Sequence, residues 1–156
     1  MKSNEAFDLF SVTEIELIYR NKGRAENRPL LDSSKAAYEL LLNTWNQNKI
    51  DLVEQFKIML LDRRNRCMGL SEISTGGMTA CIVDPKIVFA TALKARATGI
   101  IMAHNHPSGN KLPSESDKSL TKTFIQAGKM LELPVIDHII VTRDGYTSFA
   151  DEGLVP

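Results

Sequence analysis

The 156 residues, of which 43% are hydrophobic, suffice for one domain with one hydrophobic core and leave no room for a second sizeable domain. Nineteen basic and nineteen acidic side chains cancel, which excludes a general electrostatic attraction to DNA phosphates or anionic lipid, although a local basic patch is compatible with this balance. No apolar run approaches the ~20 residues of a membrane span, and MKSNEAFDLF has no signal-peptide pattern, so we expect a cytoplasmic protein without a membrane segment.

Residues 1–55 are expected to supply one strand and one helix that pack on the same domain as the rest of the chain. After a loosely held start, imperfect alternation over 11–20 (SVTEIELIYR) indicates a short strand. The basic segment 21–28 is interpreted either as a solvated loop or as a contact for an acidic partner or nucleic acid. Residues 32–34 (DSS) can cap a helix that continues to about Asn46.

A β-hairpin is predicted next, at the start of the region 56–156 that we expect to form the main body of the domain. Phe56 to Leu61 is a mostly apolar strand, the arginine-rich residues 63–66 form its turn, and Cys67 to Ile73 returns antiparallel. Cys67 and Cys81 have no CxxC spacing, so both are interpreted as core residues of a reduced protein.

Helices and strands alternate in the second half of the chain. Asp84-Pro85 can start a helix over 86–97 that ends near Gly99, with Ile87, Val88, Ala92 and Leu93 facing a sheet. The remaining elements are a strand at 100–103, a helix from Ser114 to about Glu132 with an inner stripe of Leu120, Phe124, Ala127, Met130 and Leu131, and strands at 135–141 and 146–149. This order predicts an α/β fold, a mixed β-sheet flanked by helices.

His104 and His106 follow the strand at 100–103. Histidines at i and i+2 on an extended backbone can lie on the same side, and Asp117 in the next helix can add a carboxylate. Two imidazoles and a carboxylate suit Zn²⁺, and three protein ligands leave one coordination position open, as in catalytic sites.

The pattern H-x-H, seven residues, S-x-x-D resembles the JAMM signature of JAB/MPN-domain metallopeptidases. The segments HNHPSG, LPVIDHIIV and GYTSFADEG resemble its bacterial RadC-like branch, and the resemblance extends from about Phe56 to the C-terminus. It implies an α/β/α sandwich of cytidine-deaminase-like type. RadC relatives usually carry a helix-hairpin-helix region before this domain, and no such pattern is visible in residues 1–55.

The resemblance also implies roles for individual residues. His104, His106 and Asp117 would bind Zn²⁺, and Glu72 would be the general base, with Glu54 as a rival. Ser114 is either only the N-cap of its helix or also a stabiliser of the oxyanion.

His138 lies in a predicted strand, VIDHIIV, and has three interpretations. It would be a fourth metal ligand, a buried histidine that is hydrogen-bonded within the sheet, or a residue that orients a metal ligand by bonding to its other ring nitrogen.

The function that these features favour is a zinc-dependent metallohydrolase of peptidase or isopeptidase type, with a peptide or an isopeptide-linked protein as substrate. The alternatives are a DNA-repair-associated protein, as the RadC resemblance implies, and a metal-binding interaction module without turnover. Nucleic acid is the weaker partner because the chain is neutral. No pattern indicates an oligomeric state.

Overall fold

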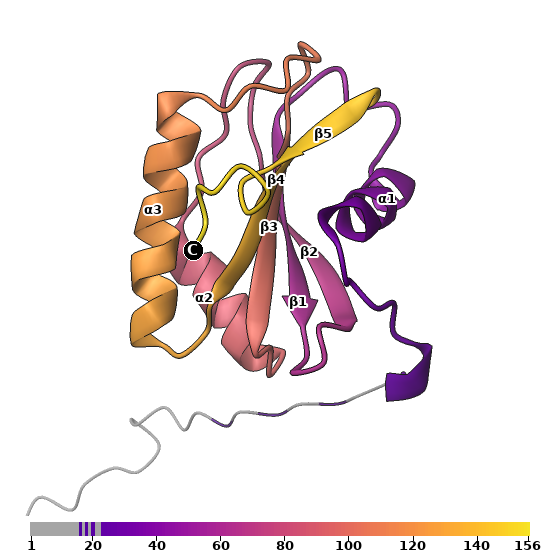
Figure 1. The fold of residues 1–156 in the computed structure, drawn as a ribbon, viewed down its shortest axis with the longest axis vertical. Helices are drawn as coiled ribbons and strands as arrows, with labels where there is room; N and C mark the ends of the chain where they lie inside the picture. Colours follow the sequence, from indigo (N-terminus) through magenta and orange to yellow (C-terminus); the bar gives the residue numbers. More distant parts are fainter. Residues whose placement is uncertain (1–15, 17, 19, 21–22) are drawn as a thin grey trace, which may run out of the picture.

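Five strands form one mixed sheet between two layers of helices (Figure 1). A computed structural model describes Glu16, Ile18, Arg20 and residues 23–156. In spatial order the strands are β2 (Cys67–Thr75), β1 (Gln55–Leu61), β3 (Gly99–Asn105), β4 (Val135–Thr142) and β5 (Gly145–Ser148). The helices are α1 (Ser34–Thr44), α2 (Pro85–Lys94) and α3 (Glu115–Met130), with a short 3-10 turn, η2 (Ala25–Asn27), before them. The strand predicted over 11–20 falls largely outside the described residues.

Neighbouring strands are antiparallel except for β3 and β4, which are parallel. Figure 1 shows α1 on one face of the sheet and α2 and α3 on the other. The predicted α/β fold, a mixed sheet flanked by helices, is therefore confirmed. None of the helices in the described part of the chain is long and apolar enough to span a membrane.

The central strand β3 is buried along its whole length and divides its side chains between the two faces. Ile101 and Ala103 belong to the core under α1, whereas Ile100 and Met102 belong to the core under α2 and α3. Because side chains alternate along a strand, His104 continues the second set, and it lies at the end of the sheet under α3.

Each helix starts where the sequence supplies a capping side chain. Ser33 accepts a hydrogen bond from Ala36 N at the start of α1, and Asp84 accepts one from Lys86 N before the proline of α2. Ser114 caps α3. These caps accept the first backbone N–H groups, which have no partner within the helix.

Two details of the helices differ from the sequence-based predictions. Helix α2 ends at Lys94, and Gly99 starts β3 instead of capping the helix. Its buried side chains are Val88, Phe89 and Ala92, whereas Ile87 and Leu93, predicted to face the sheet, are about half exposed.

The predicted inner stripe of α3 is confirmed in its first part and wrong at its end. Phe124 is buried and Leu120 and Ala127 pack against the core under α2 and α3, whereas Met130 and Leu131 are 88% and 44% exposed. The helix also buries Thr121 and Gly128, which the prediction did not include. Gly128 is small for a steric reason, because a Cβ there would lie 2.5 Å from the carbonyl oxygen of Leu133. Counting apolar residues in the sequence does not find buried helix positions that are occupied by threonine or glycine, such as Thr121 and Gly128.

Candidate metal centre

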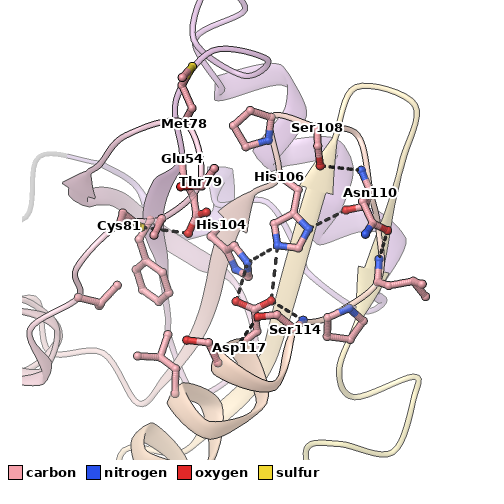
Figure 2. A pocket seen from close by; sticks show the side chains of 18 residues that line it. Glu54, Met78, Thr79, Cys81, His104, His106, Ser108, Asn110, Ser114 and Asp117 are labelled. Atoms are coloured by element: carbon pink, nitrogen blue, oxygen red, sulfur yellow. Dashed lines mark hydrogen bonds and ion pairs between the residues drawn. The ribbon is translucent and has the colours of Figure 1, made fainter.

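Three predicted ligands converge at the end of β3. His104 Nε2 lies 2.9 Å from His106 Nε2 and 3.2 Å from Asp117 Oδ1, and His106 Nε2 lies 3.5 Å from Asp117 Oδ2. Figure 2 shows the three side chains pointing toward one another. His104 and His106 leave β3 on the side that α3 covers, and Asp117 comes from the first turn of α3.

The spacing of these donor atoms fits a tetrahedral metal. Bonds of ~2.0–2.1 Å to a tetrahedral zinc place neighbouring ligand atoms about 3.3–3.4 Å apart. The distances of 2.9, 3.2 and 3.5 Å lie around that value, although the last two end on different oxygens of the Asp117 carboxylate. One donor atom from each residue lies within 4.8 Å of the other two. The group of His104, His106 and Asp117 is therefore able to hold a metal ion.

Asp117 is fixed by the cap of its own helix. Its backbone N–H donates to Ser114 Oγ at 3.1 Å, and its Oδ2 accepts the backbone N–H of Ser114 at 2.7 Å, a reciprocal capping box. The cap uses a lone pair of Ser114 Oγ and leaves the hydroxyl hydrogen available. Capping and donation toward a substrate oxygen are thus compatible at Ser114.

The Nδ1 atom of each histidine, which faces away from the converging donor atoms, has a hydrogen-bond partner that fixes the orientation of the imidazole. His106 Nδ1 donates to the backbone carbonyl of Asn110 at 2.6 Å, which leaves its Nε2 without a hydrogen in the neutral form. His104 Nδ1 lies 2.8 Å from Nε2 of His138, which is fully buried. His138 therefore stands behind His104 and does not reach the converging donor atoms, which disfavours its interpretation as a fourth ligand.

The electrostatics of the centre favour a charged carboxylate beside the imidazoles. Burial alone raises the pKa of Asp117, but the His104 and His106 rings, which donate to its carboxylate when they are protonated, outweigh burial and hold this pKa far below the ordinary range. The Asp117 carboxylate in turn raises the pKa of His106. Burial lowers the pKa of His138 well below its usual value, so this ring is neutral at physiological pH.

The three side chains lie in the wall of an open cleft of about 510 Å³. One side is formed by the loop that follows β2, including Met78, Thr79 and Cys81, and the other by the loop between β3 and α3. Ser114 lines the cleft as well. No lysine or arginine is among the described residues that line it.

Of the two glutamates considered as a general base, Glu54 lies in this cleft and Glu72 does not. Glu54 lines the cleft next to Cys81, whose Sγ lies 3.5 Å from Glu54 Oε1 (Figure 2). Glu72 accepts a hydrogen bond from Thr75 Oγ1 at 2.6 Å and lies 4.0 Å from Lys57 Nζ. The structure thus does not bring Glu72 to the ligands, and Glu54 takes its place as the candidate base.

Cys81 lies in the wall of the cleft beside Glu54. Burial, together with the nearby Glu54 carboxylate, raises the pKa of the Cys81 thiol to about 12. Both cysteines are free: Cys67 is buried and Cys81 half-buried.

Two positioning residues are missing from the sequence-based site. Asn105, between the two histidines, is fully buried and donates to the carbonyls of Ile50 and Val53 at 2.7 and 2.9 Å, while its Oδ1 accepts Gln55 N at 2.7 Å. This ties the segment that carries Glu54 to the end of β3. Thr121 Oγ1 contacts His138 Nδ1 at 2.6 Å. The sequence offered one signal for Asn105, a polar residue between two histidines at the end of a buried strand. It offered no signal for Thr121.

A family model and several known proteins match most of this chain. Residues 31–154 match a family model described as the RadC-like JAB domain. The UPF0758 protein STH371 of Symbiobacterium thermophilum is 42% identical over 103 residues, 66% of this chain and 44% of that protein. UPF0758 proteins of Thermotoga maritima and Methanosarcina mazei are 37% and 35% identical over 79% and 83% of this chain, and 54% and 56% of their own length. The chain thus spans about half the length of the curated relatives it matches.

Proposed function

Because this chain belongs to the RadC-like JAB domain family, we propose that it is a zinc-dependent hydrolase that cleaves an amide bond in a peptide or an isopeptide-linked protein. The observation that carries the proposal is the composition of the cleft. It holds three converging side chains that can bind a metal, a separate carboxylate on Glu54 and a hydroxyl on Ser114, and neither lysine nor arginine is among its described lining residues.

His104, His106 and Asp117 would hold the zinc through two imidazole nitrogens and one carboxylate oxygen. The metal would supply Lewis acidity and an activated water, which is its general contribution in hydrolases of this ligand type. Because the three side chains line the open cleft, a metal held by them would be accessible to water and substrate.

Glu54 is the proposed general base and acid. Its carboxylate takes a proton from the attacking water and delivers it to the nitrogen of the departing amine, because an amide nitrogen leaves readily only when protonated. The Ser114 hydroxyl, whose hydrogen is not used by the helix cap, would donate to the substrate oxygen as negative charge develops there.

The lining of the cleft favours an amide over a phosphodiester substrate. Nucleic acid binding depends on contacts from lysine and arginine to phosphates. The described lining residues include neither, while Glu54 and Asp117 add negative charge. The DNA-repair alternative therefore has no support from this cleft.

The remaining alternative, a metal-binding module without turnover, is separated by experiment. The zinc-loaded protein is incubated with quenched peptides, isopeptide-linked conjugates and labelled DNA, with chelated protein and the His104→Ala variant as controls. We expect one zinc per chain, cleavage of an amide substrate, and loss of both metal and activity in His104→Ala. Equal zinc in wild type and His104→Ala would refute the site, and cleavage of DNA alone would refute the substrate class.

A further inference from the structure

Four contacts behind the candidate metal centre form a closed ring that starts and ends at Asp117. The Asp117 carboxylate lies 3.2 Å from His104 Nε2, and His104 Nδ1 lies 2.8 Å from His138 Nε2. His138 Nδ1 lies 2.6 Å from Thr121 Oγ1, which donates to the backbone carbonyl of Asp117 at 2.7 Å. His138 and Thr121 are 0% and 1% exposed, so bulk water does not replace either member of the ring.

The backbone carbonyl sets the direction of the hydrogens in this ring. A carbonyl oxygen only accepts, so the single hydroxyl hydrogen of Thr121 is directed to Asp117, and Thr121 Oγ1 must accept from His138 Nδ1–H. The neutral His138 ring then has a bare Nε2, which accepts from His104 Nδ1–H. His104 consequently presents an Nε2 without a hydrogen to His106 and Asp117.

We propose that Thr121 and His138 are positioning residues that hold His104 in the one tautomer able to bind a metal through Nε2. An imidazole coordinates through the nitrogen that carries no hydrogen, and a partner on the other nitrogen fixes the tautomer and the ring orientation. This inference rests on the proposed zinc site and extends it to two residues that are not ligands.

The ring also links the first ligand to the third. Thr121 lies one turn after Asp117 on α3, so the helix turn that presents the carboxylate also sets the protonation of His104. The β3 ligand and the α3 ligand are thereby held in one hydrogen-bonded unit, with His138 on β4 between them.

Thr121→Val tests this chain of hydrogens because it keeps the branched shape and removes the hydroxyl. His138 Nδ1–H then loses its acceptor, so the ring is expected to move its hydrogen to Nε2 and donate to His104 Nδ1. His104 must then keep its own hydrogen on Nε2, where the metal binds. We expect the affinity for zinc to fall about 10–100-fold, the usual effect of removing a partner of a metal ligand.

The zinc dissociation constant is measured by competition with a chromophoric chelator, and thermal unfolding of the metal-free proteins checks that each variant folds. Thr121→Ser keeps a hydroxyl and should bind zinc as the wild type does. Thr123→Val is the matched control. Thr123 Oγ1 donates to the Ser119 carbonyl at 3.1 Å across the same helical spacing, but on the exposed side of α3.

Nitrogen-15 NMR of the histidine side chains in the metal-free protein tests the cycle of four hydrogen-bonding contacts without zinc. We expect the hydrogen of His138 on Nδ1 in wild type and on Nε2 in Thr121→Val. A wild-type His138 with its hydrogen on Nε2, or a Thr121→Val affinity equal to that of Thr123→Val, overturns the inference. A folded wild type that binds no zinc refutes the proposed function instead. The NMR result then decides by itself whether Thr121 fixes the tautomer of His138.

Discussion

Replacing Glu54 by glutamine separates metal binding from catalysis. Glutamine keeps the shape of the side chain but cannot take up a proton, so hydrolysis should fall by about 10²–10⁴-fold, the usual contribution of a positioned acid–base group. At about 1.4 kcal/mol for each factor of ten, this is a barrier increase of roughly 3–6 kcal/mol. Zinc content should stay at the wild-type level, because Glu54 is not one of the three converging ligands.

Glu72→Gln is the matched control, since it makes the same chemical change on the neighbouring strand. Glu72 is outside the cleft, and its contact to Lys57 Nζ is 4.0 Å long with the Glu72 side chain 45% exposed. Because the Glu72 carboxylate is solvated and the contact is long, this pair contributes about 0–1 kcal/mol even though the Lys57 side chain is 5% exposed. Glu72→Gln should therefore keep its activity and lose little stability.

The assay is single-substrate hydrolysis by zinc-loaded protein, with metal content and melting temperature measured on the same samples. Full activity in Glu54→Gln would remove Glu54 as the base. Loss of zinc in Glu54→Gln would make it a ligand, and loss of activity in Glu72→Gln would restore the sequence-based choice.

Three further substitutions test what stabilises the fold. Gly76→Ala should destabilise the protein by about 1–3 kcal/mol in urea unfolding, because the new Cβ would lie 2.6 Å from Cys81 Cα; unchanged stability would contradict this. Burial alone raises the pKa of Asp62, but backbone N–H groups and the Arg28 guanidinium outweigh it and lower this pKa. A carboxyl group whose pKa is lower in the folded than in the unfolded protein stabilises the fold at pH values above its unfolded-state pKa of ~4. Asp62→Asn should therefore lower the free energy of unfolding by about 1 kcal/mol at neutral pH and by nothing once the pH is well below ~4. A loss of stability that does not depend on pH would refute the assignment. Lys57 is 4% exposed, and burial lowers its pKa because the buried ammonium group has lost its hydration. Lys57→Met removes this desolvation cost and should raise the free energy of unfolding by about 1 kcal/mol. A large loss of stability would show that the ion pair with Glu72 outweighs the desolvation cost.

The sequence predicts this fold well where local chemistry determines the structure. The N-caps of α1, α2 and α3 lie at predicted positions, and the buried strands β1, β3 and β4 appear as apolar runs. The prediction is poorer where a tertiary contact decides. Gly128 lies on the buried face of α3 because the carbonyl of Leu133 leaves no room for a Cβ, and this is a property of the packed structure.

The two glutamates show the same limit within the site, and the reason is the register of the sheet. Phe56 on β1 pairs with His104 on antiparallel β3, and Glu54, two residues before Phe56, continues that face and lines the same cleft as His106. Glu72 pairs with Lys57, whose ammonium group lies 4.3 Å from the centre of the Trp45 ring in the core under α1.

A register shift in β2 decides which face Glu72 occupies. Counted regularly from the pair Phe56–Ser74, Glu72 would stand opposite Ile58, on the face that carries His104. The irregularity between Phe56 and Lys57 instead sets Glu72 opposite Lys57, and a shift of one residue moves a side chain to the other face of the sheet. Of the two glutamates considered, Glu54 is therefore on the face of the candidate metal ligands and Glu72 is not, which is why we propose Glu54 as the general base.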